Sequence, residues 1–155
     1  MDQKEKMKVL NIMLSKELGG IQEMFCNYDL ALRSRGHDVI NVIHPFAQIK
    51  PNVEKNKAKI FEIKNFSKFD LIAKLKMFFF CMRYKPDVII CHGNRAASTI
   101  RFLPIMVPVV CVAHNEKVKP IIFADRIIIV SQYIEQTLLK NKYPKAKITH
   151  INNFI

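Results

Sequence analysis

The stretch Asp87-Val88-Ile89-Ile90-Cys91-His92-Gly93-Asn94 decides the fold. Four consecutive apolar residues, Val88–Cys91, are followed at once by polar residues and a glycine. A continuous Val/Ile run of this length is typical of a strand buried on both faces, as in a parallel sheet covered by helices. Ligands of such open sheets bind beyond the carboxyl ends of the strands. The stretch therefore predicts a central strand with a candidate site at its end.

Six other short apolar runs are strand candidates, and most of them are continuous rather than alternating. They are Val9–Leu14, Val39–Ile43, Ile60–Ile63, Val107–Val112, Ile127–Val130 and Ile148–Ile151. Apolar residues at helical spacing lie between several of them, over Gly20–Arg35, about Lys68–Tyr84, about Ala96–Leu103 and from Ser131 onward. Strands that alternate with helices form right-handed βαβ units. We therefore predict an α/β chain with a Rossmann-like, doubly wound parallel sheet, in a single domain of 155 residues.

The chain is strongly basic, with a net charge of +12. Such a charge favours an anionic partner: phosphate, nucleic acid or an acidic membrane face. Residues 50–85 carry +7 of this charge and include the predicted helix, Lys68–Lys85 at its widest. This helix either packs on the sheet with its basic face in water or lies on an anionic membrane. Phe78, Phe79 and Phe80 cannot all share one helical face, so the membrane alternative stays open.

The cysteines give no sign of a disulfide framework or a metal centre. None of the four forms a C-x-x-C pair, and each lies in an apolar stretch, so we expect reduced thiols in a cytoplasmic protein. A zinc site from Cys91, His92 and Cys111 is an alternative, but its spacing matches no standard ligand pattern, and we expect no metal. The longest apolar stretch, Phe102–Ala113, contains two prolines and is too short to span a membrane.

Polar side chains follow two of the predicted strands directly. His92, Asn94 and Arg95 come after one strand, and His114 and Asn115 after the next. Because the carboxyl ends of parallel strands meet at one edge of a sheet, we expect these side chains to lie near one another. The alternative for each histidine is an ordinary loop or core residue without a ligand.

A pair of glycines, Gly19-Gly20, follows the first predicted strand and opens the first helix. Glycines let a ligand approach the backbone, and a helix N-terminus favours an anion. The full G-x-G-x-x-G pattern is absent, so a classical dinucleotide site is not expected, and an ordinary strand-to-helix turn is the alternative. The P-loop and G-x-S-x-G patterns are also absent from the sequence.

Six segments in this order resemble the N-terminal domain of retaining GT-B glycosyltransferases of the "glycosyl transferases group 1", or family 4-like, type. The segments are Leu18–Gly20, Leu30–Val39, Lys85–His92, Pro108–His114, Ala124–Ser131 and Lys147–Asn153. The last departs from the family's "PNG", because this part of the sequence reads Ile151-Asn152-Asn153-Phe154.

The resemblance implies roles for the residues named above. In that family, two Rossmann-like domains face each other across a cleft, the N-terminal one holding the acceptor and the C-terminal one the nucleotide sugar. By this resemblance, Gly19 and Gly20 lie near the donor's diphosphate, and His114 is the catalytic residue facing the transferred sugar. The acceptor side is then lined by His92, Asn94, Arg95 and Asn115. No cofactor is implied besides the nucleotide sugar, which is a substrate.

The resemblance also implies a domain organisation. Residues 1–155 correspond to the acceptor-side domain, and the donor-binding domain is absent from them, so we expect this chain to be inactive alone or to act with a separate C-terminal-domain chain. The acceptor is expected to be a cell-envelope glycan or glycolipid, such as lipopolysaccharide. The expected location is the cytoplasm, peripheral on the inner face of the cytoplasmic membrane.

Two other function classes remain as alternatives. One is a non-catalytic basic α/β module that binds an anionic membrane or nucleic acid. Binding to anionic vesicles but not to oligonucleotides, the result we expect, would favour the glycosyltransferase hypothesis. The other is a stand-alone flavodoxin-like enzyme, which lacks support because no Ser/Thr-rich phosphate loop follows the first strand.

Overall fold

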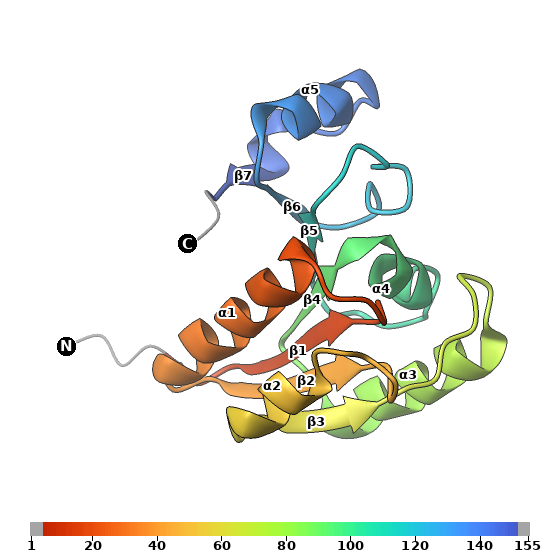
Figure 1. The fold of residues 1–155 in the computed structure, drawn as a ribbon. Coiled ribbons are helices and arrows are strands. Elements are labelled where there is room, and N and C mark those ends of the chain that lie inside the picture. Colours follow the sequence, from red (N-terminus) through yellow and green to blue (C-terminus); the bar gives the residue numbers. More distant parts are fainter. Residues whose placement is uncertain (1–4, 152–155) are drawn as a thin grey trace.

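One seven-stranded, all-parallel sheet organises the chain, and a computed structural model describes residues 5–151 of it (Figure 1). The strand order is β3-β2-β1-β4-β5-β6-β7. The strands are β1 (Lys8–Met13), β2 (Asp38–Ile43), β3 (Lys59–Glu62), β4 (Val88–His92), β5 (Val109–Ala113), β6 (Arg126–Ile129) and β7 (Ile148–His150). Every apolar run singled out in the sequence forms one of them, which confirms the predicted fold class. Asn152-Asn153-Phe154 lies outside the described residues.

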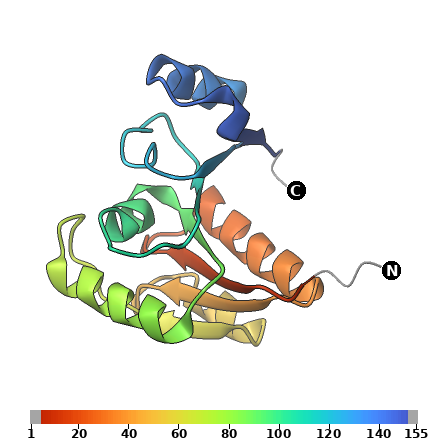
Figure 2. The same ribbon diagram turned by 180° about the vertical axis from the view of Figure 1, so that it is seen from behind.

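Helices cover both faces of the sheet. They are α1 (Gly20–Ser34), α2 (Lys50–Lys55), α3 (Leu71–Tyr84), α4 (Gly93–Ile100) and α5 (Gln132–Lys140), and a 3₁₀ turn spans Lys145–Lys147. Side chains of α1 and α2 pack on one face, and those of α3, α4 and α5 join the apolar cluster on the other. In Figure 1 the helix α1 lies alongside β1, and Figure 2 shows α3 and α4 from behind.

Helix ends are where the sequence predictions need correction. The helix expected over Lys68–Lys85 begins at Leu71, because the Asp70 carboxylate accepts a hydrogen bond from the Ala73 N–H and caps it. Lys68 therefore lies in the preceding loop, and Lys85 is the left-handed C-cap residue. The helix expected from Ala96 begins three residues earlier, at Gly93, directly after the strand. Ser131 caps α5 as predicted, accepting from the Ile134 N–H.

One helix and the start of one strand also differ from the sequence predictions. The short helix α2 was not expected, because six residues with a proline in the first turn give no clear helical pattern. The strand β5 begins at Val109 rather than Val107.

No helix within residues 5–151 is both long enough and apolar enough to cross a bilayer.

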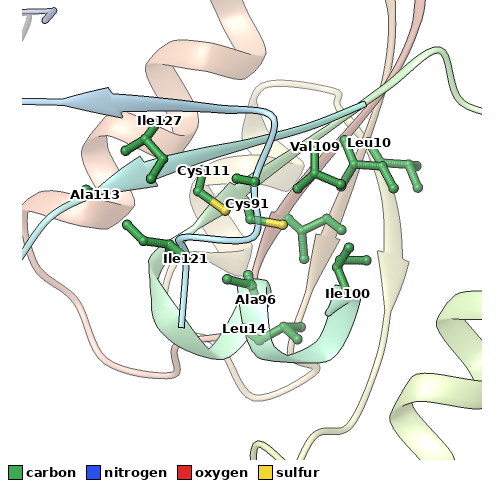
Figure 3. Packing of buried hydrophobic residues seen from close by; sticks show 14 of the residues in the cluster. Leu10, Leu14, Cys91, Ala96, Ile100, Val109, Cys111, Ala113, Ile121 and Ile127 are labelled. Atoms are coloured by element: carbon green, nitrogen blue, oxygen red, sulfur yellow. The ribbon is translucent and has the colours of Figure 1, made fainter. Parts of the chain in front are cut away.

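The two faces of the sheet differ in chemistry because strand side chains alternate. On one face the buried strand residues are all apolar, and their cluster joins Leu10, Cys91 and Cys111 to residues of α4 such as Ile100 (Figure 3). On the other face, under α1, the apolar residues form two smaller clusters. The buried polar residues of the chain include Asn11, Asn41 and Asp29.

Candidate functional site

A hollow of about 450 Å³ lies at the carboxyl ends of β1 and β4, beside the first turn of α4. All four residues predicted for the acceptor side line it. The complete lining consists of Ser15, Lys16, Glu17, Ile21, Phe66, His92, Gly93, Asn94, Arg95 and Asn115. The fold thus brings together residues from three loops, the end of β4 and the first turns of α1 and α4. Their role as acceptor ligands stays a prediction.

His92 is held inside the protein and is 2% exposed. As the last residue of β4, it points to the α1 face, where its ring makes edge contacts with Phe25 and Tyr28, with centroids 5.4 and 5.1 Å away. Its Nε2 lies 2.9 Å from the Oδ1 atom of Asn11. Its Nδ1 is buried and has no hydrogen-bond partner among the described residues. His92 is therefore a buried residue in the wall of the hollow, with one ring nitrogen hydrogen-bonded and the other without a partner among the described residues.

His114 lies close to His92, as expected from its place after the neighbouring strand. It follows Ala113 at the end of β5, and the centroids of the two imidazole rings are 6.0 Å apart. Its ring is partly buried, and its Nε2 has no hydrogen-bond partner within residues 5–151. His114 does not line the hollow itself, whereas the next residue, Asn115, does. The catalytic role given to His114 stays a prediction.

Burial keeps both imidazoles neutral at physiological pH. Desolvation by burial and, to a smaller extent, the charge of the nearby His114 together lower the pKa of His92 to about 3. Desolvation also lowers the pKa of His114 to about 4. The two rings can therefore donate or accept hydrogen bonds to a ligand but do not supply positive charge. Positive charge at the hollow comes from the exposed side chains of Lys16 and Arg95.

Gly93 is a site residue that the sequence reading did not single out. Its φ is +80°, a conformation that L side chains rarely adopt, and a Cβ there would lie 2.8 Å from the Cδ1 atom of Ile21. This glycine lets α4 start immediately after His92 and lets α1 approach it. A glycine placed directly after the strand, in the stretch that decides the fold, was the signal available in the sequence.

Gly19 and Gly20 lie at the N-terminus of α1, as predicted, but not in the same hollow. Gly19 is the N-cap residue and lines a separate hollow of about 400 Å³, which includes Gln22 and Cys26 of α1 and Ile49 and Asn52 near α2. A Cβ on Gly20 would meet nothing within 4 Å. The open helix N-terminus is a suitable place for an anion. Binding of a donor diphosphate there stays a prediction.

The alternative zinc site is not supported by the geometry. Cys91 and His92 are consecutive in β4, so they face opposite sides of the sheet. Cys91 lies with Cys111 in the apolar cluster, and all four cysteines are free. Within the part of the chain that the structure describes, no three His, Cys, Asp or Glu side chains are grouped to hold a metal ion.

The comparisons with known proteins agree with this fold. The family model described as Glycosyltransferase Family 4 matches residues 18–155, and the chain belongs to this family. No curated protein matches the sequence. The match to the family confirms the resemblance stated from the sequence.

Solved structures of glycosyltransferases share the fold at low sequence identity. Anabaena HepE, in complex with UDP and glucose, has a TM-score of 0.77 and 16% identity; the match covers 96% of this chain and 45% of HepE. A glycosyltransferase from Rickettsia africae has a TM-score of 0.75 and 16% identity, with 95% and 43% covered. The lipopolysaccharide outer core galactosyltransferase WaaB has a TM-score of 0.72 and 14% identity, with 96% and 46% covered. The chain therefore spans less than half the length of these GT-B proteins.

Proposed function

We propose that this chain is the acceptor-side domain of a glycosyltransferase that moves a sugar from a nucleotide-sugar donor to a cell-envelope glycan or glycolipid. The observation that carries the proposal is the convergence of His92, Asn94, Arg95 and Asn115 on one hollow, with His114 beside it. Family membership supports the reaction class. The complexes of HepE with UDP and glucose support a nucleotide-sugar donor, and WaaB supports a lipopolysaccharide-type acceptor.

The proposed chemistry needs placed hydrogen bonds and positive potential more than a strong base. Glycosyl transfer passes through an oxocarbenium-like transition state with a departing diphosphate, which is best stabilised by preorganised dipoles. The neutral ring of His114 would hydrogen-bond the transferred sugar. The N-terminus of α1 at Gly19 and Gly20 would face the diphosphate. Asn94, Arg95 and Asn115 would hold the acceptor.

The test is a transfer assay with a complementing domain. The 155-residue chain is incubated with labelled UDP-glucose and a bacterial lipid and lipopolysaccharide extract, alone and with the separately expressed nucleotide-sugar domain of a complete family member. We expect transfer only in the mixture, and a loss of about 100-fold when His114 is changed to Ala. The control is His150→Ala, which alters an exposed residue of β7. Transfer by the chain alone, or equal transfer by His114→Ala, would contradict the proposal.

We further propose that α3 places this domain on the inner, anionic face of the cytoplasmic membrane. Ala73, Met77 and Cys81 of α3 are buried, and Phe80 stacks on Phe61 at 3.8 Å. Large apolar residues of the helix nevertheless point outward, together with residues of the loop before it. The exposed set is Phe66, Phe69, Leu71, Ile72, Leu75, Phe79 and Met82. An exposed apolar patch of this kind marks an interaction surface.

A basic hollow next to this patch supports an anionic partner. It measures about 360 Å³ and is lined by Lys68, Lys74, Arg101 and Lys119, with Phe69 and Phe102 among its other walls and no carboxylate. Lys74 donates to the Ser98 and Arg101 carbonyls, and burial and the charge of Arg101 lower the pKa of Lys74. A phosphate group would offset this concentration of positive charge. An apolar patch bordered by cations is the pattern of a surface-bound membrane helix.

Vesicle sedimentation tests the membrane proposal. The chain should bind vesicles that contain phosphatidylglycerol but not pure phosphatidylcholine, and binding should fall as salt rises. Ile72→Ser with Phe79→Ser should weaken binding roughly tenfold, because two exposed apolar anchors are lost. Leu139→Ser, at an exposed apolar residue of α5, is the matched control. Equal binding to both vesicle types, or oligonucleotide binding in place of vesicle binding, would contradict the proposal.

A further inference from the structure

A chain of buried polar side chains links the surface of α1 to His92. Asn11, Asn41, Asp29 and His92 are each at most 2% exposed. Asn11 and Asn41 are paired across β1 and β2 and both face α1, from which Asp29 projects. Buried polar groups of this kind are costly unless they are fully hydrogen-bonded. Their arrangement therefore needs an explanation beyond packing.

The carboxylate of Asp29 sets the direction of every hydrogen bond in this chain. Arg33 donates to both oxygens of Asp29 at 2.8–3.1 Å. The Nδ2 of Asn41 lies 2.8 Å from Asp29 Oδ1. A carboxylate paired with a guanidinium accepts hydrogen bonds and does not donate them, so Asn41 must present its amide nitrogen to Asp29. The carbonyl oxygen of Asn41 must then point the other way, toward Asn11.

The orientation of Asn41 in turn determines the direction of the hydrogen bonds from Asn41 to His92. The Oδ1 of Asn41 accepts from Asn11 Nδ2 at 2.8 Å, and this nitrogen also donates to the Phe25 carbonyl at 3.2 Å. Asn11 therefore presents its oxygen to His92, and the His92 Nε2, 2.9 Å away, must carry the proton. In a neutral imidazole the other nitrogen, Nδ1, is then a bare acceptor. It is the atom of His92 that has no partner among the described residues.

We propose that Asp29, Asn41 and Asn11 are positioning residues that hold His92 in its Nε2-protonated tautomer, so that Nδ1 is a fixed acceptor for a substrate hydroxyl in the hollow. The assignment of a sugar hydroxyl as the donor rests on the proposed function. A fixed acceptor binds a hydroxyl and disfavours an analogue that lacks the donor at that position, because the buried nitrogen would stay unpaired. His92 acts as a specificity residue in this proposal.

The tautomer can be measured on the chain without any sugar. In ¹⁵N-labelled protein at pH 7, two-bond proton–nitrogen correlations distinguish a protonated ring nitrogen from a bare one. We expect His92 to show protonated Nε2 and bare Nδ1. In Asn41→Leu, which does not touch His92, the Asn11 amide loses one of its two acceptors and is oriented only by the Phe25 carbonyl, so the two His92 nitrogen signals should move toward each other. Asn11→Leu, which removes the acceptor itself, should produce the larger shift.

His44 provides an internal control within the same spectra. Its Nδ1 accepts from the Phe46 N–H at 3.0 Å, so it has the same tautomer but no contact with the polar chain. Its signals should stay unchanged in both variants, which also reports that the fold is intact. A protonated Nδ1 on His92 in the parent chain would overturn the proposal, as would an unchanged His92 tautomer in both variants. Neither result depends on whether sugar transfer is observed.

Discussion

The two faces of the sheet come from the same strands but have different chemistry. Toward α3, α4 and α5, the strands present an apolar layer that contains Leu10, Ile89 and Ile127, each fully buried. Toward α1, the apolar residues are interrupted by Asn11, Asn41 and His92. Apolar burial is non-directional, whereas buried hydrogen bonds demand one geometry. The comparison teaches that one layer mainly stabilises the fold and the other mainly orients side chains at the strand ends.

The largest expected effect is a loss of stability in acid, which acts through the histidines of the polar layer. The folded-state pKa values of His92 and His114, about 3 and 4, lie below the ordinary value of 6.5. The unfolded chain therefore takes up protons first, so stability is complete above pH 6.5 and is lost as pH falls toward 4. Each histidine contributes a slope of up to roughly 1.4 kcal/mol per pH unit.

Urea unfolding at a series of pH values measures this slope. His114→Gln removes one of these two imidazoles and should make the decline between pH 6.5 and 4 shallower than in the parent chain. An identical slope in the variant would show that His114 is not buried in its neutral form, and the polar layer would then have no special sensitivity to acid.

The next largest effect is expected in the apolar layer. Leu10→Ala removes a fully buried side chain from β1 and should lower the free energy of unfolding by about 3 kcal/mol, because a cavity remains. Urea denaturation measures the loss. The tautomer of His92 should be unchanged in this variant, since Leu10 faces away from it. A changed tautomer would mean that the two layers are not independent.

Two glycines at the edge of the polar layer, Gly93 and Gly20, allow a matched comparison with smaller expected changes in the free energy of unfolding. Gly93→Ala should cost about 1–3 kcal/mol, because the backbone is left-handed and the new methyl group meets Ile21. Gly20→Ala should be neutral or stabilising by about 0.5 kcal/mol, because its surroundings are open. Thermal unfolding of the two variants checks the order. Equal losses would contradict the close packing of α1 against the start of α4.

Only a small stability effect is expected for Asn41→Leu, although this variant should change the tautomer of His92. Asn41→Leu leaves Asp29 bonded to Arg33 and Asn11 bonded to Phe25, so the free energy of unfolding should change by no more than about 1 kcal/mol. Denaturation midpoints compared with those of Leu10→Ala measure this. A loss as large as that of Leu10→Ala would assign the asparagine to stability and remove the contrast between the layers.

Most of the fold could be predicted because each strand contains a short apolar run and most of these runs are continuous rather than alternating. Helix bounds were less predictable, since α3 starts where Asp70 caps it and α4 starts where Gly93 adopts a left-handed backbone. The position of His92 and Asn115 at the same edge of the sheet could be predicted from topology alone, because the carboxyl ends of parallel strands lie together. The position of Gly19 in a separate hollow could not be predicted, because that hollow depends on the position of α2, a helix with no clear sequence pattern.

The polar chain could not be predicted from one strand at a time. An asparagine inside an apolar run, as at Asn11 and Asn41, was the available signal in both strands. Their contact depends on the exact register of β1 against β2, which pairs these two residues. A shift by one residue would turn one of them into the apolar layer. Register is a property of the assembled sheet, and local patterns do not contain it.

The uneven burial of the cysteines makes the chain ready for site-selective labelling. Cys81, Cys91 and Cys111 are buried, and burial raises the pKa of Cys81 to about 11, so a thiol-reactive dye should reach the partly exposed Cys26 first. Cys26 lines the hollow beside Gly19. A fluorophore attached there would report on the occupancy of the α1 N-terminus in the unmodified sequence, without introducing a new attachment point.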